Sequence, residues 1–273
     1  MSCEDKYKTL LQLLRRFDRA TVAFSGGVDS TLLLRAALDA LGTDKVLAIT
    51  AASPFFPEWE LQDSRTLARQ LGARHILIQC DLLSLPEVVR NDALRCYHCK
   101  KALFGLCLAT ARDQGFSTLL DGTNRDDDSD YRPGHRAALE LGVRSPLAEA
   151  GLTKHDIRDL SRQRGLPTWD RPAFACLASR IPYDTAIDTK QLEQVERCEA
   201  VLRSLGFNGA RARHHGQTVR IEITPDLFPK LVEEPTRRAV IEGSKAAGFI
   251  YVSLDLEGYR TGSLNETLEP LNL

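Results

Sequence analysis

A short glycine-rich loop between an apolar run and an amphipathic pattern constrains the fold of this chain more than any other segment. The loop is Ser25-Gly26-Gly27-Val28-Asp29-Ser30. The apolar run at 21–24 is typical of a buried strand, and the apolar positions between 33 and 41 fall on one face of a helix that ends at Gly42. A strand, a tight glycine loop and a helix in this order indicate an α/β protein with a parallel sheet.

The loop has the chemistry of an anion site. Gly26 and Gly27 let the backbone approach a ligand closely, and their successive amides can point at it. Ser25 and Ser30 add hydroxyl donors, and the helix that begins near Asp29 presents its positive end to the same point. A triphosphate suits such a site, although no Gly-Lys-Ser/Thr closes the loop as in the Walker pattern. The alternative is a tight glycine turn that binds nothing.

The first half of the chain continues to alternate short apolar runs with helical patterns. We expect strands at 46–50, 75–79 and 117–120 and a helix over 57–71. Thr153 and Asp156 fit a capping box that opens a further helix. The sequence therefore predicts a parallel-sheet, ATP-binding α/β domain over residues 1–170.

The pattern changes after about residue 170. We expect a helix over 189–205, strands at 210–214 and 218–223, a helical stretch up to Gly248 and a strand at 249–254. This α-β-β-α-β order predicts a small α+β domain over residues 171–273. Arg211 and Arg213 alternate on the first of these strands, so their side chains share a face. They indicate either a phosphate site or a solvated charged face.

Composition narrows the classes of function. The 273 residues are 43% hydrophobic and 27% charged, with a net charge of −1, so no overall basic field attracts nucleic acid. No apolar run approaches the roughly 20 residues that span a bilayer, and the N-terminus lacks a signal-peptide pattern. We therefore expect a cytoplasmic enzyme without nucleic-acid or membrane partners. In that compartment we expect its seven cysteines to be thiols, metal ligands or nucleophiles rather than disulfides.

Two of the cysteines form a C-x-x-C motif, Cys96 and Cys99, which we expect to precede a helix over 102–112. Such a pair can bind a metal ion or an iron–sulfur cluster, act as a redox pair, or be purely structural. Cys176 lies in a small apolar loop, where it is either a packed thiol or a reactive one. Arg180 nearby would stabilise a thiolate or an anionic substrate.

Residues 25–31 carry the signature of the pyrophosphate-loop ATPase superfamily, whose members cleave ATP between the α and β phosphates. Further stretches resemble one family within it, at 121–124, 130–134, 144–147, 176–183, 203–207, 211–213, 220–222 and 256–262. Over nearly its whole length the chain resembles the LarE family of ATP-dependent sulfur transferases. This family helps to build the nickel-pincer nucleotide cofactor of lactate racemase. It adenylates the carboxylates of pyridinium-3,5-biscarboxylate mononucleotide and converts them to thiocarboxylates.

The resemblance implies a pyrophosphate-loop domain of the adenine nucleotide alpha hydrolase-like fold, and it assigns roles to named residues. The ATP-binding positions are Ala23, Phe24, Ser25, Gly26, Gly27, Asp29, Ser30, Thr50, Asp121, Gly122 and Asn124, with Mg²⁺ as the companion ion. Cys176, Asp29 and Arg180 match catalytic positions, and Arg211, Arg213 and Arg260 match positions for the substrate phosphate. Glu199 and Glu222 match acidic positions where a divalent metal would bind. Arg260 is otherwise a hairpin-edge arginine.

The cysteines separate two branches of the family. In the single-cysteine branch the residue that matches Cys176 gives up its own sulfur and becomes dehydroalanine. This chain also has Cys96 and Cys99, as do members thought to bind a 4Fe-4S cluster through three thiolates. Three protein ligands leave one iron open to carry an extra sulfide. The resemblance further implies a homo-oligomer, a hexamer, and transient contact with other proteins of nickel-pincer biosynthesis.

Three other functions remain in view. A tRNA-thiolating enzyme shares the loop but would need a basic RNA-binding surface. An amide-forming synthetase would leave the sulfur residues idle. A non-catalytic ATP- and iron–sulfur-binding module would release no pyrophosphate.

Overall fold

The computed structural model describes residues 2–129, 133–172, 175–260 and 262–267, so parts of two stretches that carry the resemblance, at 130–132 and 261, lie outside the described residues. The chain forms two compact units. The first comprises Met1–Ser53, Glu58–Cys80 and Cys96–Arg171, and the second comprises Pro54–Pro57, Asp81–Arg95 and Pro172–Leu273. The second unit therefore includes two short segments from the first half of the sequence.

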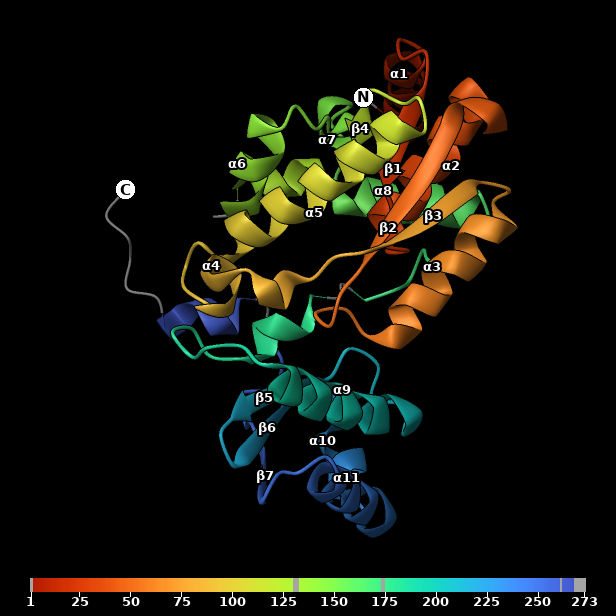
Figure 1. Ribbon diagram of the computed structural model, residues 1–273. Coiled ribbons are helices and arrows are strands. Elements are labelled where there is room, and N and C mark those ends of the chain that lie inside the picture. The colour runs from red at the N-terminus through yellow and green to blue at the C-terminus, as the bar shows by residue number, and fades with distance from the viewer. Residues whose placement is uncertain (1, 130–132, 173–174, 261, 268–273) are drawn as a thin grey trace. The chain divides into compact units, whose positions relative to one another are not determined.

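The first unit is built on a four-stranded sheet in which every pair is parallel. Its strands are β1 (Ala20–Ala23), β2 (Val46–Ala52), β3 (Arg74–Gln79) and β4 (Leu119–Leu120), in the order β3-β2-β1-β4 (Figure 1). This confirms the predicted α/β fold class. The chain moves outward from β1 to β3 and then returns to the other side of β1. The strand order thus reverses between β1 and β4, and ligands of open α/β sheets bind at such a point.

Helices cover both faces of this sheet. They are α1 (Cys3–Leu14), α2 (Val28–Leu41), α3 (Glu58–Gln70), α5 (Arg95–Asp113), α6 (Pro133–Glu140), α7 (Pro146–Glu149) and α8 (Lys154–Gln163). Alternate residues of β2 serve two cores: Val46 and Ala48 pack with α1, α2 and α8, whereas Leu47 and Ile49 pack with α5. The alternation follows from the two-residue period of a strand, and it explains why β2 is apolar throughout.

One boundary prediction was wrong in a way that matters for the site. The helix expected over 102–112 begins at Arg95, so Cys96 and Cys99 lie within it, near its start, and not ahead of it. The residues from 95 to 101 are mostly polar, and their spacing gave no apolar stripe. The backbone N–H of Arg95 donates to the carbonyl oxygen of Asp92, which starts the turn from a preceding loop.

The second unit contains α4 (Pro86–Val89) and a small α+β fold. Its elements are α9 (Thr189–Ser204), β5 (Arg211–His215), β6 (Thr218–Glu222), α10 (Phe228–Val232), α11 (Glu234–Ala246) and β7 (Tyr251–Leu254). The sheet order is β5-β6-β7, with β5 and β6 antiparallel and β6 and β7 parallel. The predicted helix–strand–strand–helix–strand order is confirmed, with the short α10 in addition.

The register of this sheet sorts its side chains by polarity. Arg211 pairs with Glu222 and Arg213 with Arg220, so these four lie on one face. Between them Ala212 pairs with Ile221, on the opposite face, and both belong to the core that α9 and α11 cover. In the part of the chain that the structure describes, no helix is both long and apolar enough to span a membrane.

Candidate active site

The loop after β1 has the shape that its glycines predict. Gly26 has φ +74°, and a Cβ there would lie 3.3 Å from the Cα of Ser64, so both the conformation and the space require glycine. Gly27 is the N-cap of α2 and has no side chain to bond the N–H groups of the first turn. Those N–H groups carry the positive end of the helix dipole, which suits a bound phosphate.

The two serines of the loop are held close together. Their hydroxyl oxygens, Ser25 Oγ and Ser30 Oγ, are 3.1 Å apart. The N–H of Gly27 donates to Ser25 Oγ (3.3 Å), and Ser30 Oγ donates to the Gly27 carbonyl oxygen (3.2 Å). The hydroxyl groups are therefore positioned on the loop before a ligand arrives, which lowers the entropy lost on binding.

The loop after β4 lies against the start of α2. A Cβ on Gly122 would come within 3.1 Å of the Ser30 nitrogen and 3.2 Å of the Asp29 Cβ, so only glycine permits this approach. Asn124 Nδ2 donates to Asp29 Oδ1 at 3.4 Å. Asp121 is buried and accepts hydrogen bonds from Ser145 Oγ (2.7 Å) and from Thr123. The structure thus brings the residues predicted at 25–30 and 121–124 together, at the carboxyl ends of β1 and β4.

Thr50 supports the end of β1. Its hydroxyl donates to the carbonyl oxygen of Phe24 (2.6 Å) and lies 2.8 Å from Nε2 of His75. Burial, with a smaller effect of Arg65, lowers the pKa of His75, so the imidazole is neutral at pH 7. Ala23 ends β1, and Phe24 continues it by donating its N–H to the Ile49 carbonyl oxygen.

Two basic side chains beside the phosphate loop were not predicted from the sequence. Lys154 Nζ lies 2.5 Å from Asp29 Oδ2. Arg171 donates to the carbonyl oxygen of Gly26 (3.1 Å) and to Asp63 Oδ2 (2.7 Å). Lys154 directly follows the helix cap Thr153. A basic residue at the start of a helix is unfavourable, and this was the one sequence signal that could have identified it. Arg171 stands in no motif, and only the folded chain brings it to the loop.

The C-x-x-C pair lies on one face of a helix. Cys96 and Cys99 are three residues apart near the start of α5, and both are half-buried and outside any disulfide. A Cβ on Gly134 would lie 2.9 Å from Lys100 Cγ and 3.5 Å from the Cys96 carbonyl oxygen, so glycine lets the start of α6 pack onto this turn. Two neighbouring thiols on one face are a donor set that fits an iron–sulfur cluster.

The Cys176 segment of the second unit is shaped by a buried arginine. Arg180 is 1% exposed and makes a two-pronged ion pair with Glu199, with Nε and Nη2 at 2.7 and 2.9 Å from the carboxylate oxygens. Its Nη1 donates to the carbonyl oxygens of Ala175 (2.6 Å) and Cys176 (3.0 Å). The guanidinium therefore fixes the backbone at Cys176. A catalytic role for Arg180 stays a prediction.

Asn91 holds the residues that follow Cys176, and the sequence interpretation missed it. It is fully buried at φ +59°, and its Nδ2 donates to the carbonyl oxygens of Pro182 (2.8 Å) and Thr185 (3.0 Å). Its Oδ1 accepts from Arg95, whose guanidinium also donates to the Ala178 carbonyl oxygen (3.1 Å). Asparagine tolerates the left-handed region better than most residues.

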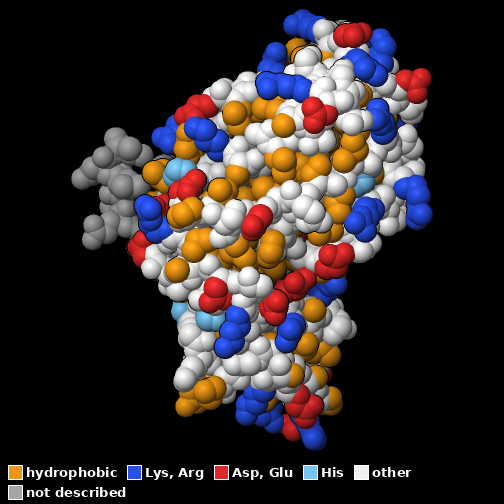
Figure 2. All heavy atoms as spheres, viewed as in Figure 1, with side chains coloured by type: hydrophobic (Ala, Val, Ile, Leu, Met, Phe, Trp, Pro, Cys, Tyr) orange, Lys and Arg blue, Asp and Glu red, His pale blue; other side chains and the backbone are white. Residues whose placement is uncertain are grey.

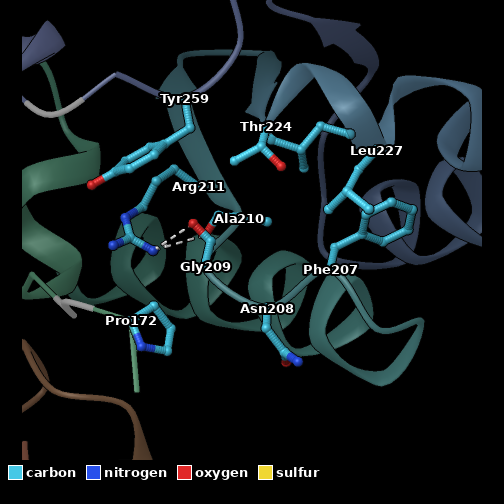
Figure 3. A pocket seen from close by; sticks show the side chains of 10 residues that line it. Pro172, Phe207, Asn208, Gly209, Ala210, Arg211, Thr224, Leu227 and Tyr259 are labelled. Carbon is cyan, nitrogen blue, oxygen red and sulfur yellow. Dashed lines mark hydrogen bonds between the residues drawn. The ribbon is translucent and has the colours of Figure 1, made fainter. Parts of the chain in front are cut away.

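The predicted phosphate arginines occupy different surroundings. Arg211 lines a pocket of about 280 Å³ together with Pro172, Phe207 and Tyr259. Its guanidinium lies 5.1 Å from the centre of the Tyr259 ring and donates to the carbonyl oxygens of Gly209 and Ala210 (Figure 3). Burial, aided by Arg180, lowers its pKa, although a guanidinium stays charged at neutral pH.

Arg213 and Glu222 form a buried ion pair of 2.7 Å, and Arg220 adds a second contact to the same carboxylate (3.0 Å). Arg213 also donates to the Ser179 carbonyl oxygen (2.7 Å), yet its buried Nε has no hydrogen-bond partner among the described residues. Arg260 is 40% exposed and pairs with Glu257 and Glu266, each at 2.6 Å.

The acidic pair suits arginine better than a metal ion. Glu199 accepts from Arg180 and from the Ala212 N–H, and both oxygens of Glu222 accept from arginines. Within the described ranges, no three His, Cys, Asp or Glu side chains are grouped as a metal site. A divalent metal at Glu199 and Glu222 stays a prediction.

A parallel sheet whose first strand ends in this phosphate loop defines an ATP-using protein of the pyrophosphate-loop class. Residues 8–92 match the NAD synthase family. Pyridinium-3,5-bisthiocarboxylic acid mononucleotide synthase of Lactiplantibacillus plantarum is 39% identical over 98% of this chain and 96% of its own length. An uncharacterized protein of Synechocystis sp. is 42% identical over 97% of this chain and 98% of its own.

The chain therefore belongs to the family of this synthase, the LarE family. A more partial similarity connects it to the tRNA-specific 2-thiouridylase of Azorhizobium caulinodans, which is 29% identical over 56% of this chain and 49% of its own length. The shared part of the two chains is about half of each.

Proposed function

We propose that this chain is an ATP-dependent sulfur transferase that adenylates the carboxylates of pyridinium-3,5-biscarboxylate mononucleotide and converts them to thiocarboxylates. The observation that carries the proposal is the near full-length similarity to the bisthiocarboxylic acid mononucleotide synthase. The built phosphate loop supports it, since Gly26, Gly122 and the paired Ser25 and Ser30 all have the geometry that an ATP site requires.

In the first step the loop binds the phosphates of ATP. The first-turn N–H groups of α2 and the hydroxyl groups of Ser25 and Ser30 donate to phosphate oxygens, and bound Mg²⁺ adds charge neutralisation. A substrate carboxylate oxygen attacks the α phosphorus, and the bond between the α phosphorus and the bridging oxygen breaks. Pyrophosphate leaves with the electron pair, and its charge develops where the loop donors already point.

In the second step sulfur replaces AMP on the activated carbonyl carbon. A 4Fe-4S cluster on Cys96, Cys99 and Cys176 would supply a sulfide for this transfer. Cys96 and Cys99 share one helical face, which supports the first two ligands. The third ligand, Cys176, is what the family resemblance implies, and within the second unit Arg180 fixes the backbone at this residue.

The substrate phosphate would bind the arginines of the second unit. Arg213 has a buried Nε–H without a partner among the described residues, and an anion would satisfy it. Arg211 adds a guanidinium beside an aromatic ring, a combination that suits a nucleotide. Arg260 is tied to two carboxylates, so its part in phosphate binding requires that it exchange them.

The test is single-substrate turnover under anaerobic conditions. Reconstituted protein is mixed with Mg-ATP and the pyridinium biscarboxylate mononucleotide, and AMP, pyrophosphate and the product mass are measured. We expect AMP and pyrophosphate in equal amounts and a product in which sulfur replaces oxygen. Ser30→Ala should slow the release of pyrophosphate. Ser204→Ala, which removes a hydroxyl group at the end of α9, should not. No pyrophosphate above the substrate-free blank would refute the proposal.

A tRNA-thiolating activity is the second candidate, because of the partial similarity to a 2-thiouridylase. On the face in Figure 2, Lys and Arg side chains are mixed with Asp and Glu, and the chain has a net charge of −1. We expect no RNA retention at about 0.15 M salt. Salt-dependent tRNA binding together with thiolated tRNA would favour this candidate instead.

We also propose a cytoplasmic location and a homo-oligomer, a hexamer, in keeping with the family. The half-buried cysteines Cys96, Cys99 and Cys176 form no disulfide, and they need a reducing compartment to stay ligands. Light scattering of the purified protein measures the subunit number, and a monomer at working concentration would contradict the hexamer.

A further inference from the structure

Lys154 is the first residue of α8, and both its backbone N–H and its side-chain ammonium make contacts near the phosphate loop. Its backbone N–H donates to Asp126 Oδ2 (2.8 Å), which ties the start of α8 to the segment that follows β4. Its Nζ lies 2.5 Å from Asp29 Oδ2. The first contact positions the backbone of Lys154, and the second places its ammonium beside the acid of the phosphate loop.

The Asp29 carboxylate of this pair has the same sign of charge as the phosphates that the loop would bind. Asp29 lies in the first turn of α2, where the glycine loop offers its N–H groups to an anion. A carboxylate beside an incoming triphosphate repels it, unless the carboxylate is neutralised. Lys154 supplies that neutralisation, and Asn124 holds the other carboxylate oxygen at 3.4 Å. The side chain of Lys154 is 32% exposed, so its ammonium can move.

A second ion pair on the same helix has no such setting. Lys6 Nζ lies 2.5 Å from Asp156 Oδ2, and Asp156 belongs to the capping box of α8. The two pairs have the same length and similar partial burial. Only the Lys154 pair includes a residue of the phosphate loop. Substitution of Lys6 therefore removes an ion pair alone, whereas substitution of Lys154 also removes the expected contact with ATP.

We propose that Lys154 is an ATP-binding residue that exchanges partners. Its ammonium, which lies 2.5 Å from Asp29 Oδ2, would contact a phosphate oxygen of bound ATP, and the Asp29 carboxylate would then be available to Mg²⁺. Lysine suits this role because its ammonium is a mobile point charge and a common phosphate ligand. The proposal rests on the ATP-dependent function proposed above, and on no particular sulfur acceptor.

The test is the binding of a non-cleavable α,β-methylene ATP with Mg²⁺, measured by calorimetry on the full chain without the pyridinium substrate. We expect Lys154→Gln to raise the Kd about 10- to 100-fold, as for one lost hydrogen bond to a charged group. Lys154→Arg should recover most of the affinity. Lys6→Gln should lower the Tm by a similar amount to Lys154→Gln and leave the Kd unchanged.

A double substitution distinguishes a direct contact between Lys154 and phosphate from an indirect effect of Lys154 on Asp29. If Lys154 contacts phosphate, Lys154→Gln still weakens binding in an Asp29→Asn background. An unchanged Kd in Lys154→Gln, or no further loss in the double variant, would overturn the partner exchange. Either result leaves the proposed sulfur transfer standing. A wild-type chain that binds no ATP would refute both.

Discussion

The guanidinium of Arg171 donates a hydrogen bond to the carbonyl oxygen of Gly26 in the phosphate loop. The same side chain pairs with Asp63 of α3, and Arg158 of α8 donates to the Arg171 carbonyl oxygen (2.6 Å). Arg171 is the last residue of the first unit, and the residues that follow it lead to Cys176. The ATP loop is thus held by the residue at which the chain leaves the nucleotide-binding unit.

Loss of this contact should weaken ATP binding. We expect Arg171→Gln to raise the Kd for Mg-ATP about three- to tenfold, because the Gly26 carbonyl loses a donor that holds the loop. Arg164→Gln is the matched control, since Arg164 is similarly exposed and pairs with Glu4 (3.2 Å) away from the loop. Equal affinities in the two variants would show that Arg171 does not position the loop.

Loop packing predicts a sharp contrast between two glycines. Gly122→Ala places a methyl group within 3.2 Å of the Ser30 nitrogen and the Asp29 Cβ, so the loops after β1 and β4 must separate and the affinity for Mg-ATP should fall at least tenfold. Gly105→Ala lies within α5, where an added Cβ meets no described atom within 4 Å. It should leave binding unchanged and stabilise the protein by up to about 1 kcal/mol. Calorimetry and thermal unfolding measure both.

The buried Arg180–Glu199 pair should be essential for folding stability. Arg180→Ala leaves the Glu199 carboxylate without its main partner, and we expect a loss of about 3–5 kcal/mol in the free energy of unfolding. Arg197→Ala breaks an exposed pair on the same helix and should cost less than about 0.5 kcal/mol. Urea unfolding measures the difference. Similar values for the two variants would mean that water reaches the Arg180 site.

The cysteines should divide by burial. Burial raises the pKa of Cys107 to about 12 and that of Cys198 to about 11, so neither forms a thiolate at neutral pH. We expect about four irons per reconstituted wild-type chain and a marked loss in Cys96→Ser. Cys3→Ser, a half-buried thiol on α1, should keep its iron.

Mass spectrometry after repeated turnover completes this test. An intact chain is expected if the sulfide comes from a cluster. A chain that has lost one sulfur at Cys176 would indicate sacrificial transfer, and iron retained in Cys96→Ser would remove that residue from the ligand set.

Acid should weaken the start of α8. Burial opposes ionisation of Asp156, but hydrogen bonds from Lys6 and Thr153 outweigh it and lower the pKa from 3.8 to about 2. Because the folded-state pKa is depressed, this stabilisation is present above about pH 4 and is lost as the pH falls towards 2. Unfolding free energies of wild type and Asp156→Asn should therefore converge over that range. Curves that stay parallel would contradict the assignment.

Local chemistry in the sequence predicted the elements that carry the ATP loop. The glycines at 26 and 27, the apolar run before them and the stripe of α2 act over a few residues, and β1 and α2 appear where expected. The start of α5 was missed because Tyr97 is buried against Arg136 and Glu140, about 40 positions away, a tertiary effect that periodicity does not report.

The side chains missed in the site depend on contacts between distant segments. Lys154 and Asp29 are 125 positions apart, and Asn91 reaches carbonyl groups more than 90 positions away. No spacing rule connects such residues. The roles of Cys176, Arg211 and Arg213 came from family resemblance, and they stay predictions until the experiments above are done.

The second unit takes residues 54–57 and 81–95 from the first half of the chain. During synthesis these segments emerge long before the carbonyl groups that the buried Asn91 side chain bonds, at residues 182 and 185. The first unit can assemble once residue 171 has left the ribosome, while Asn91 waits for its partners. Separate expression of residues 1–171 and 172–273 would therefore divide the Cys176 unit itself, and mixing the two fragments should restore it better than either fragment folds alone.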